Sequence, residues 1–415
     1  MTNSFSLLRI TPDRMLDTFN QLALIGSTGD GGVNRPTFSE AHLAARKWFK
    51  EQIEASGLEF RTDGAGNHSA FLTCQRSNVP TLLLGSHLDS VPKGGRFDGA
   101  LGVMAALEVL RTVKESRISL RLNLEAIDFT DEEGTHLSLF GSSAISGHLH
   151  PEDLKNPYSG RENFTVGLVR AGLTEASLFQ AKRAKESLAG YLELHIEQGK
   201  RLERAKLDIG IVSAIVGYGS YRMSYIGRAD HAGSTTMEDR LDAGQGVAAF
   251  ILAVRETVMR DFPNCVANVG KIEFVPGASN IVPARADFLL EFRSPDENQL
   301  AELDAALMKL AQQKATQFGL ELSVEPLGKH SPNLMSAEIQ DAFKNSCDDL
   351  GLSSTVLASG AIHDAQSLVD VCPIGMIFVP SVDGASHAPR EFTKWEDCVN
   401  GANVLLQTVL RLAAG

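Results

Sequence analysis

The stretch GSHLDSVPKGGRFDGALG, Gly85–Gly102, decides the fold predicted for this chain, because it joins a strand pattern to a helix pattern. The short apolar run Thr81–Leu84 predicts a buried strand, and Ala100–Val113 predicts a helix. His87 and Asp89 then lie at the carboxyl end of a strand, where open α/β sheets place their ligands. We therefore expect an α/β fold with a ligand site at this edge of the sheet.

The pair His87 and Asp89 has two interpretations. Residues i and i+2 of a strand project to the same side, so the Asp89 carboxylate is placed to accept the free ring N–H of His87 and to select the tautomer that binds a metal. The alternative is a strand-end histidine followed by an Asx turn, with no metal. A short motif becomes informative only in its structural context.

Composition limits the class of protein. The 415 residues are 43% hydrophobic and 22% charged, which is typical of a soluble globular chain with two domains. A formal net charge of −12 argues against binding to nucleic acid or to an anionic membrane through a broad basic face. We expect a small polar substrate instead.

Cysteine usage and the amino terminus suggest a cytosolic protein. Five cysteines without CxxC spacing favour reduced, structural thiols. The first sixteen residues, MTNSFSLLRITPDRML, lack the pattern of a signal peptide, and no apolar run is long enough for a membrane span. We therefore expect a cytoplasmic location.

The order of elements predicts a discontinuous first domain with an insertion. Residues 1–211 and 329–415 alternate strands and helices, which indicates a mostly parallel sheet. Residues 212–328 instead show the order β-α-β-β-α-β of a ferredoxin-like α+β domain. Residues 151–186 are polar and irregular, and their pattern resolves no fold.

Two helix starts carry capping-box spacing. Thr37 and Glu40 predict one helix start. Ser294 and Glu297, with Pro295 at the first helical position, predict another, which ends at Gly319.

Polar side chains that follow the apolar runs form the ligand set of a two-metal hydrolytic site. They are His87 with Asp89, the turn at Asp98, the pair Glu132 and Glu133, His195 and His387. Asp98, between glycines, is the candidate bridge between the ions. One of the two adjacent glutamates would ligate a metal while the other takes a proton from the attacking water. A solvated acidic turn is the alternative for that pair.

Six motifs are similar to those of the M20 metallopeptidase superfamily. They are GSHLDSVPKGGRFDGALG, DFTDEEG, LHIEQG, ADHAGSTTMEDRLDA, SGAIHDA and FVPSVDGASHAPRE. Within the superfamily they resemble the hydantoinase/carbamoylase branch, which comprises N-carbamoyl-L-amino acid hydrolases, β-ureidopropionases and allantoate amidohydrolases. The motifs occur in the right order across both predicted domains.

The resemblance implies roles for individual residues. It implies two divalent ions per subunit, bound by His87, Asp98, Glu133, His195 and His387, with Asp98 bridging and Glu132 as the general base. Substrate would be held by Gln198, His231, Asn280 and Arg293, and the planar guanidinium of Arg293 suits an α-carboxylate. The inserted domain would act as a lid and a dimerisation surface, and His231 would stabilise the oxyanion in a neighbouring subunit's site.

Three positions depart from the branch. Thr236 stands where a proline usually precedes Met237, and His136 and Leu137 replace arginine and phenylalanine, which puts the substrate fit in doubt. His363 is interpreted either as a residue that lines the pocket or orients a metal ligand, or as one end of a structural hydrogen bond. The glycines form neither GxGxxG nor a P-loop, which argues against nucleotide binding.

The sequence therefore predicts a cytoplasmic homodimeric hydrolase of linear amides. Its reaction would release an amino acid, ammonia and carbon dioxide from an N-carbamoyl-L-amino acid. The alternatives are an allantoate amidohydrolase, a β-ureidopropionase, an aminoacylase or peptidase, and a non-catalytic ligand-binding member. Zinc, manganese, cobalt and nickel all accept this ligand set.

Overall fold

The computed structural model describes residues 8–74 and 76–414, which form two compact units by their internal contacts. The first unit contains the described residues up to Ser213, together with Leu334–Leu357 and the chain from Ile362 onward. The second contains Ala214–Asn333 and Ala358–Ala361, where the sequence pattern predicted residues 212–328. The short return of the chain at Ala358–Ala361 carries no sequence signal.

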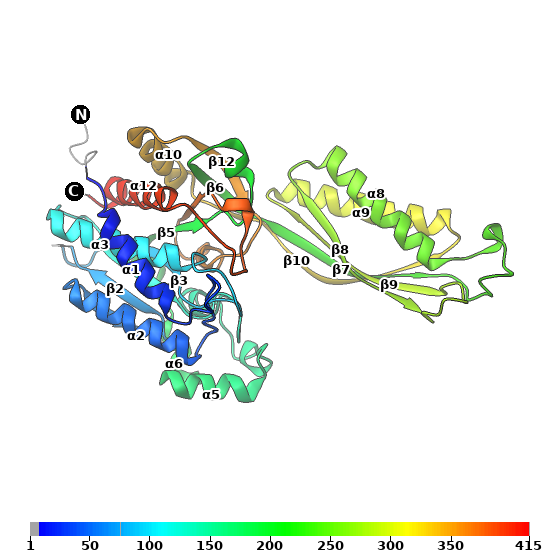
Figure 1. Cartoon of the computed structure of the whole chain (residues 1–415), viewed down its shortest axis with the longest axis horizontal. Helices are drawn as coiled ribbons and strands as arrows, with labels where there is room; N and C mark the ends of the chain where they lie inside the picture. Colours follow the sequence, from blue (N-terminus) through cyan, green and yellow to red (C-terminus); the bar gives the residue numbers. More distant parts are fainter. Residues whose placement is uncertain (1–7, 75, 415) are drawn as a thin grey trace. The chain divides into compact units, whose positions relative to one another are not determined.

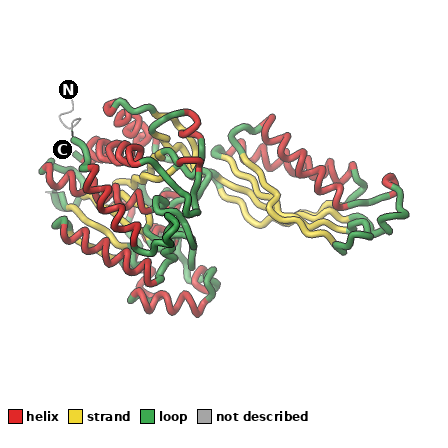
Figure 2. The backbone as a smooth tube through the Cα atoms, viewed as in Figure 1, coloured by secondary structure: helices red, strands yellow, loops and turns green. Residues whose placement is uncertain are grey.

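The first unit is built on a nine-stranded sheet with the order β1-β2-β4-β3-β5-β13-β6-β11, with β12 paired to β6 (Figures 1 and 2). Its strands are β1 (Glu59–Thr62), β2 (His68–Leu72), β3 (Thr81–His87), β4 (Asn123–Phe129), β5 (Leu188–Ile196), β6 (Ile209–Ile215), β11 (Asn333–Leu334), β12 (Ser354–Ser359) and β13 (Ile374–Val379). The central strands β4, β3, β5 and β13 are parallel to one another. The predicted α/β fold with a mainly parallel sheet is confirmed.

The edges of this sheet are antiparallel. Strands β1 and β2 form a hairpin with its turn at residues 63–67, β2 runs antiparallel to β4, and β6 runs antiparallel to β13. A parallel pair needs a long crossover, whereas a short turn joins only antiparallel strands. The parallel centre is therefore the part in which several strand ends meet at one edge.

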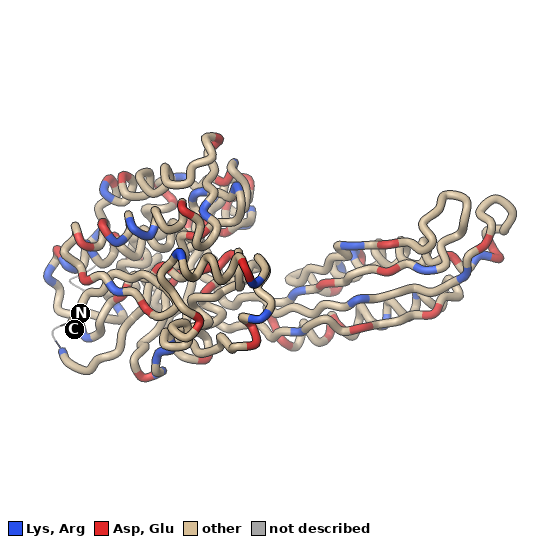
Figure 3. The backbone as a smooth tube through the Cα atoms, turned by 90° about the horizontal axis from the view of Figure 1, so that it is seen from below, with Lys and Arg blue, Asp and Glu red and all other residues tan. Residues whose placement is uncertain are grey.

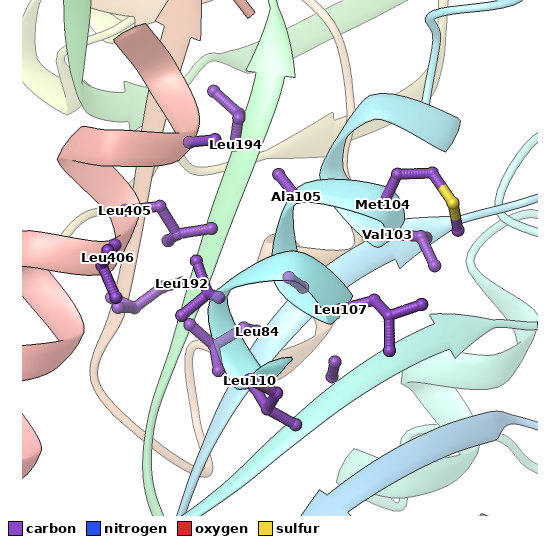
Figure 4. Close-up of a cluster of buried hydrophobic side chains, with 14 of the residues drawn as sticks. Leu84, Val103, Met104, Ala105, Leu107, Leu110, Leu192, Leu194, Leu405 and Leu406 are labelled. Atoms are coloured by element: carbon purple, nitrogen blue, oxygen red, sulfur yellow. The ribbon is translucent and has the colours of Figure 1, made fainter. Parts of the chain in front are cut away.

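Helices pack on the sheet and bury a continuous core. They are α1 (Pro12–Leu24), α2 (Glu40–Ala55), α3 (Ala100–Ser116), α10 (Ala337–Leu350) and α12 (Trp395–Ala413). Figure 4 shows leucines of α3 and α12 meeting Leu84 of β3 and Leu192 of β5. Each fully buried leucine contributes about 1.5–3 kcal/mol to folding. Helix α3 is buried along most of its length, so the segment before it is held in place from both ends.

The segment 151–186, which the sequence left unresolved, is mainly helical. It contains α5 (Arg161–Ala171) and α6 (Glu175–Leu178), with short 3₁₀ turns at Asp153–Lys155, Phe179–Ala181 and Lys185–Ser187. A separate apolar cluster joins this segment to α4 (Phe140–Ser146). Helix α7 (Arg201–Ala205) follows β5, and α11 (Asp364–Leu368) precedes β13.

The second unit is a four-stranded antiparallel sheet, in the order β10-β7-β9-β8, with two helices packed on it (Figure 1). The elements in chain order are β7 (Gly217–Ile226), α8 (Ala243–Asp261), β8 (Val266–Val275), β9 (Arg285–Ser294), α9 (Glu297–Gln317) and β10 (Glu321–His330). Alternate residues of β9 are buried against the helices. The order of strands and helices in this unit is therefore the predicted β-α-β-β-α-β.

Both predicted capping boxes are wrong by two residues. Helix α2 is capped by Ser39, whose hydroxyl accepts from the backbone N–H of His42. Helix α9 is capped by Asp296, which accepts from Gln299 N at 2.8 Å, while Ser294 ends β9. In each case the capping residue is the one immediately before the first helical residue, where its side chain reaches the free N–H groups of the first turn. The spacing of residue types alone does not identify that residue.

Charged residues of both signs are interspersed along both units (Figure 3). All five cysteine side chains are buried and none forms a disulfide. Among residues 8–74 and 76–414, no helix is long and apolar enough to cross a membrane. The start of the predicted leaderless amino terminus, residues 1–7, lies outside the described residues, and the cytoplasmic location stays a prediction.

Candidate active site

The predicted metal ligands meet at the carboxyl edge of the parallel strands. His87 is the last residue of β3, and His195 is the penultimate residue of β5. Glu132 and Glu133 follow β4, and His387 follows β13. Because these four strands are parallel neighbours, their ends bring residues from distant parts of the chain to one place.

Asp98 lies at the centre of the cluster. Its Oδ1 is 3.1 Å from His195 Nε2 and 3.7 Å from His87 Nε2, and its Oδ2 is 3.5 Å from His387 Nε2. Gly99 follows with φ +63°, and a Cβ there would lie 2.4 Å from the His87 ring. Only glycine fits that conformation and that space, so the chain turns tightly into α3 directly after Asp98.

Two sets of candidate ligand atoms share Asp98. His87, Asp98 and His195 form one set, and Asp98, Glu133 and His387 form the other, with all ligand atoms of a set within 4.8 Å of one another. A carboxylate shared between two such sets is the arrangement of a two-metal site. That Asp98 bridges two ions stays a prediction, and these positions fit it.

Backbone carbonyls orient the two buried histidines. His87 Nδ1 donates to Asp89 O at 3.1 Å, and His195 Nδ1 donates to Ile196 O at 2.9 Å. In both rings Nε2 therefore faces the carboxylates. This is the orientation in which a neutral imidazole binds a metal through Nε2.

The carboxylates are too crowded to be charged together without a cation. Burial and the charge of Asp98 raise the pKa of Glu133 to about 9, and burial with the charge of Glu133 holds the pKa of Glu132 well above its usual range. Glu133 Oε1 is buried without a hydrogen-bond partner. An orphaned carboxylate oxygen among imidazole nitrogens is the donor set that a divalent cation requires, so these residues fit the metals that the sequence predicts.

The His195 ring and the Asp98 carboxylate, 3.1 Å apart, shift each other's pKa in opposite directions. Burial alone would lower the pKa of His195, but the nearby charge of Asp98 raises it to about 9. Burial alone would likewise raise the pKa of Asp98, but His195 and His87 lower it. A positive charge between these two side chains, either a proton or a metal cation, stabilises the buried Asp98 carboxylate.

Asp89 requires a correction. The sequence predicts that its carboxylate accepts the ring N–H of His87, but Oδ1 is 3.7 Å from Nδ1 and the backbone carbonyl of Asp89 accepts instead. The carboxylate accepts the backbone N–H groups of Glu132 and Glu133, at 3.4 and 3.2 Å. The rule that side chains i and i+2 project to the same side holds within a strand. It fails here because His87 is the last residue of β3 and Asp89 lies beyond the strand. Asp89 thus orients the loop of the two glutamates.

Two further residues bind Asp98. Gln198 Nε2 and Ser386 Oγ each donate to Asp98 Oδ2 at 2.7 Å. The sequence assigned Gln198 to the substrate and gave Ser386 no role. In this structure the Gln198 amide lies on the predicted bridge itself, and a contact with substrate stays a prediction.

His363 packs beside a predicted ligand. Its ring lies edge-on to His195, with centroids 4.7 Å apart, and its Nδ1 is 4.0 Å from Glu193 Oε1. Burial and the nearby His195 hold its pKa well below its usual range. A neutral ring in this position is consistent with a residue that orients His195, while lining of a substrate pocket stays untested.

The two substitutions after DEEG are buried. His136 packs on Phe38 and Phe164, and its Nδ1 lies 2.6 Å from Ser159 Oγ. Leu137 belongs to the apolar cluster around α4 and α5. Leu137 also lines a hollow of about 320 Å³, together with Phe140, His148, Leu149 and Tyr158.

In the second unit, His231 and Asn280 lie on paired segments. Ala232 N donates to Asn280 O at 3.0 Å, and His231 forms a bridge with Ile281. His231 Nδ1 accepts from the backbone N–H groups of Gly233 and Ser234, both at 3.1 Å. The exposed Nε2 therefore carries the ring proton and can donate a hydrogen bond.

Arg293 lies at the opposite end of β9. Its Nε and Nη2 contact Glu291 Oε1 at 2.8 Å, and its Nη1 donates to Gly360 O at 2.7 Å. A guanidinium has five N–H donors, so these contacts leave one on each terminal nitrogen. A guanidinium with unused N–H donors can bind a further carboxylate.

Comparison with known proteins identifies the family. A model of the family described as Peptidase family M20/M25/M40 matches residues 83–411, well over half of the chain. The chain belongs to this family. The predicted M20 hydrolase is thereby confirmed.

Relatives of this M20 chain match it over nearly its whole length. An N-carbamoyl-L-amino acid amidohydrolase of Geobacillus stearothermophilus is 36% identical over 408 residues, covering 98% of this chain and 100% of that protein. An allantoate amidohydrolase of Bacillus subtilis is 31% identical, covering 96% and 97%. The crystal structure of a hydantoinase/carbamoylase family amidase from Burkholderia multivorans has a TM-score of 0.91 at 31% identity, covering 98% and 99%. The resemblance to this branch is confirmed.

Proposed function

We propose that this M20 protein hydrolyses the carbamoyl C–N bond of N-carbamoyl-L-amino acids, giving the amino acid, ammonia and carbon dioxide. The observation that carries the proposal is the convergence of His87, Asp98, Glu133, His195 and His387 at one sheet edge, with Glu132 beside them. Full-length similarity to the Geobacillus amidohydrolase supports the substrate class. Allantoate is the second candidate, because the Bacillus relative is nearly as similar.

The residues divide the chemistry between them. Two divalent ions held by the five ligands would supply Lewis-acid chemistry, lowering the pKa of water and polarising the carbamoyl oxygen. Glu132 removes a proton from the attacking water and returns it to the leaving nitrogen.

Substrate recognition falls to residues of the second unit. Arg293 would bind the α-carboxylate through its remaining N–H groups, and His231 would donate from Nε2 to the developing oxyanion. Asn280, beside His231, would hold the carbamoyl end.

The proposed homodimer is supported by the positions of these residues at opposite ends of the second unit's sheet, with Arg293 in β9 and His231 and Asn280 beyond the other end of that strand. Arg293 is eight residues from Arg285, so the strand separates the Arg293 end from the end near His231 by about 27 Å. An N-carbamoyl amino acid is much shorter than this. We therefore assign Arg293 to its own subunit's site and His231 with Asn280 to the site of a partner subunit, with the second unit as lid and dimerisation surface.

The test of the substrate is a panel assay. Protein of measured metal content would be given N-carbamoyl-L- and D-amino acids, N-carbamoyl-β-alanine, allantoate and a dipeptide, and ammonia or amine release would be followed. The highest kcat/KM should fall on an N-carbamoyl-L-amino acid. A preference for allantoate would replace the proposed substrate, and no turnover of any ureido compound would overturn the proposal.

The test of the shared site uses hybrid dimers. Glu132→Gln and His231→Ala subunits, each inactive alone, would be coexpressed with different affinity tags and purified as heterodimers. If His231 acts in the partner's site, each heterodimer contains one complete site and should show about half of the wild-type activity. Inactive heterodimers would place His231 in its own subunit's site.

A further inference from the structure

Glu391 is a buried glutamate beside Asp98, the predicted bridging ligand, and it has no role in the proposed chemistry. Glu391 is four residues after His387, and its side chain is only 3% exposed. Its Oε1 accepts from the backbone N–H groups of Phe97 and Asp98, at 2.8 and 3.0 Å. Its Oε2 lies 3.1 Å from Ser386 Oγ. One carboxylate thus joins the segment that carries Asp98 to the segment that carries His387.

The surroundings of this carboxylate are built for it. A Cβ on Gly95 would lie 2.0 Å from the Glu391 carboxyl carbon, so only glycine leaves room there. The φ angle of Gly95 lies outside the left-handed region, so the space, and not the backbone conformation, requires the glycine. Ser386 completes the connection, because the same hydroxyl also contacts Asp98 Oδ2 at 2.7 Å.

We infer that Glu391 is a positioning residue that sets the separation of Asp98 and His387, two ligands that would share one cation. The inference rests on the proposed two-metal site. Asp98 precedes α3, whereas His387 lies in a loop after β13 with its side chain 52% exposed. A backbone hydrogen bond from Val382 N to Phe392 O, at 2.9 Å, closes that loop on itself, and His387 Nε2 lies 3.5 Å from Asp98 Oδ2. The connection between the loop and the Asp98 segment is a separate requirement. The Glu391 carboxylate supplies that connection through two main-chain N–H groups.

Three substitutions separate reach from charge. Glu391→Gln keeps an oxygen that accepts from Phe97 and Asp98 but loses the charge. Glu391→Asp keeps the charge but is one methylene too short, and Glu391→Ala loses both. If the role is to hold the two segments together, Gln should resemble the wild type and Asp should resemble Ala. Glu396→Gln, which removes a charge from an exposed glutamate on α12, is the matched control.

The readout is metal binding, with no substrate present. Metal-free protein would be titrated with Co²⁺ or Zn²⁺ by calorimetry, and its melting temperature recorded beforehand. Glu391→Ala and Glu391→Asp should bind at least one of the two ions about 10- to 100-fold more weakly, as for other residues that orient metal ligands. Glu391→Gln and Glu396→Gln should stay within about threefold of the wild type.

Other outcomes would overturn the inference. Wild-type affinity in Glu391→Ala would show that the connection is not needed, and weak binding in Gln with normal binding in Asp would show that charge, not reach, matters. If Glu391→Ala does not fold, the comparison of Gln with Asp decides. Gly95→Ala, which displaces the carboxylate without changing it, should weaken binding too. A wild-type protein that binds two ions but cleaves no ureido compound would refute the proposed function and leave this inference intact.

Discussion

The two units carry their candidate functional residues in opposite environments. In the first unit, His87, Asp98 and His195 are at most 6% exposed and contact one another directly. In the second unit, His231 and Asn280 are exposed at one end of the sheet, and Arg293 is half-buried near the other. Buried polar groups must satisfy one another, so their geometry is set before any ligand binds. The geometry of exposed groups is instead set when a substrate or a partner subunit binds them.

Metal removal should give the largest effect and should act on one unit only. A chelator should reduce turnover to background, and a divalent ion should restore it, because the buried carboxylates need a cation. Amide hydrogen exchange followed by mass spectrometry should slow on metal addition around residues 87–99, 130–137 and 386–391. Peptides from residues 214–333 of the same sample are the control. Equal protection of both units would contradict the contrast between them.

Glu132→Gln should lower kcat by about 10²- to 10⁴-fold, the usual contribution of a general base. Metal content and melting temperature should remain near wild type, because Glu132 is not one of the five predicted ligands. Glu152→Gln, an exposed glutamate of the same unit, is the control. A variant with near-native kcat would remove Glu132 as the base.

Arg293→Ala should raise KM by about 10- to 100-fold for substrates with an α-carboxylate, with a smaller change in kcat. The reason is that a charged bidentate contact binds the ground state and the transition state alike. Steady-state kinetics with a carboxylate substrate and its amide would measure the difference, and Arg285→Ala at the other end of β9 is the control. An equal loss for both substrates would show that Arg293 does not bind the carboxylate.

Mild acid should destabilise the first unit through His42. This side chain is fully buried, and burial with the charge of Arg46 holds its pKa well below the usual 6.5. Below pH 6.5 the His42 imidazole is therefore protonated in the unfolded state but neutral in the folded state. The stability that is present above pH 6.5 is lost as the pH falls, because the unfolded state binds the additional proton. Between pH 7.5 and 5.5 this group costs about 1.4 kcal/mol.

Urea unfolding at these two pH values would measure that loss. His42→Asn removes the titrating ring and keeps an acceptor near the position of Nδ1 for the Phe38 N–H group, so its unfolding free energy should depend less on pH by about that amount. His330→Gln, at an exposed histidine of the second unit, should leave the dependence unchanged. The same pH dependence in all three proteins would rule out His42 as the cause.

The positions of the predicted metal ligands could be expected from the sequence, but several of their contacts could not. His87 could be placed because it follows the apolar run Thr81–Leu84, and His195 because it lies near the end of the alternating strand pattern Tyr191–Ile196. The ends of parallel strands converge. Asp89 was assigned to the wrong partner atom because its side chain lies beyond the regular strand. Glu391 occurred within the quoted motif FVPSVDGASHAPRE but had no spacing signal, since its partners are near position 97.

Local sequence thus determined most of the strands and helices, the types of the candidate ligands and the family. It did so because hydrophobic periodicity and short motifs depend only on neighbouring residues. Tertiary structure decided which atoms form hydrogen bonds. The carbonyl of Asp89 accepts from His87, the amide of Gln198 donates to the Asp98 carboxylate, and the carboxylate of Glu391 accepts from the backbone N–H of Asp98. Such contacts join residues that are distant in the chain, and only the packing of the sheet and its loops sets their distance and direction.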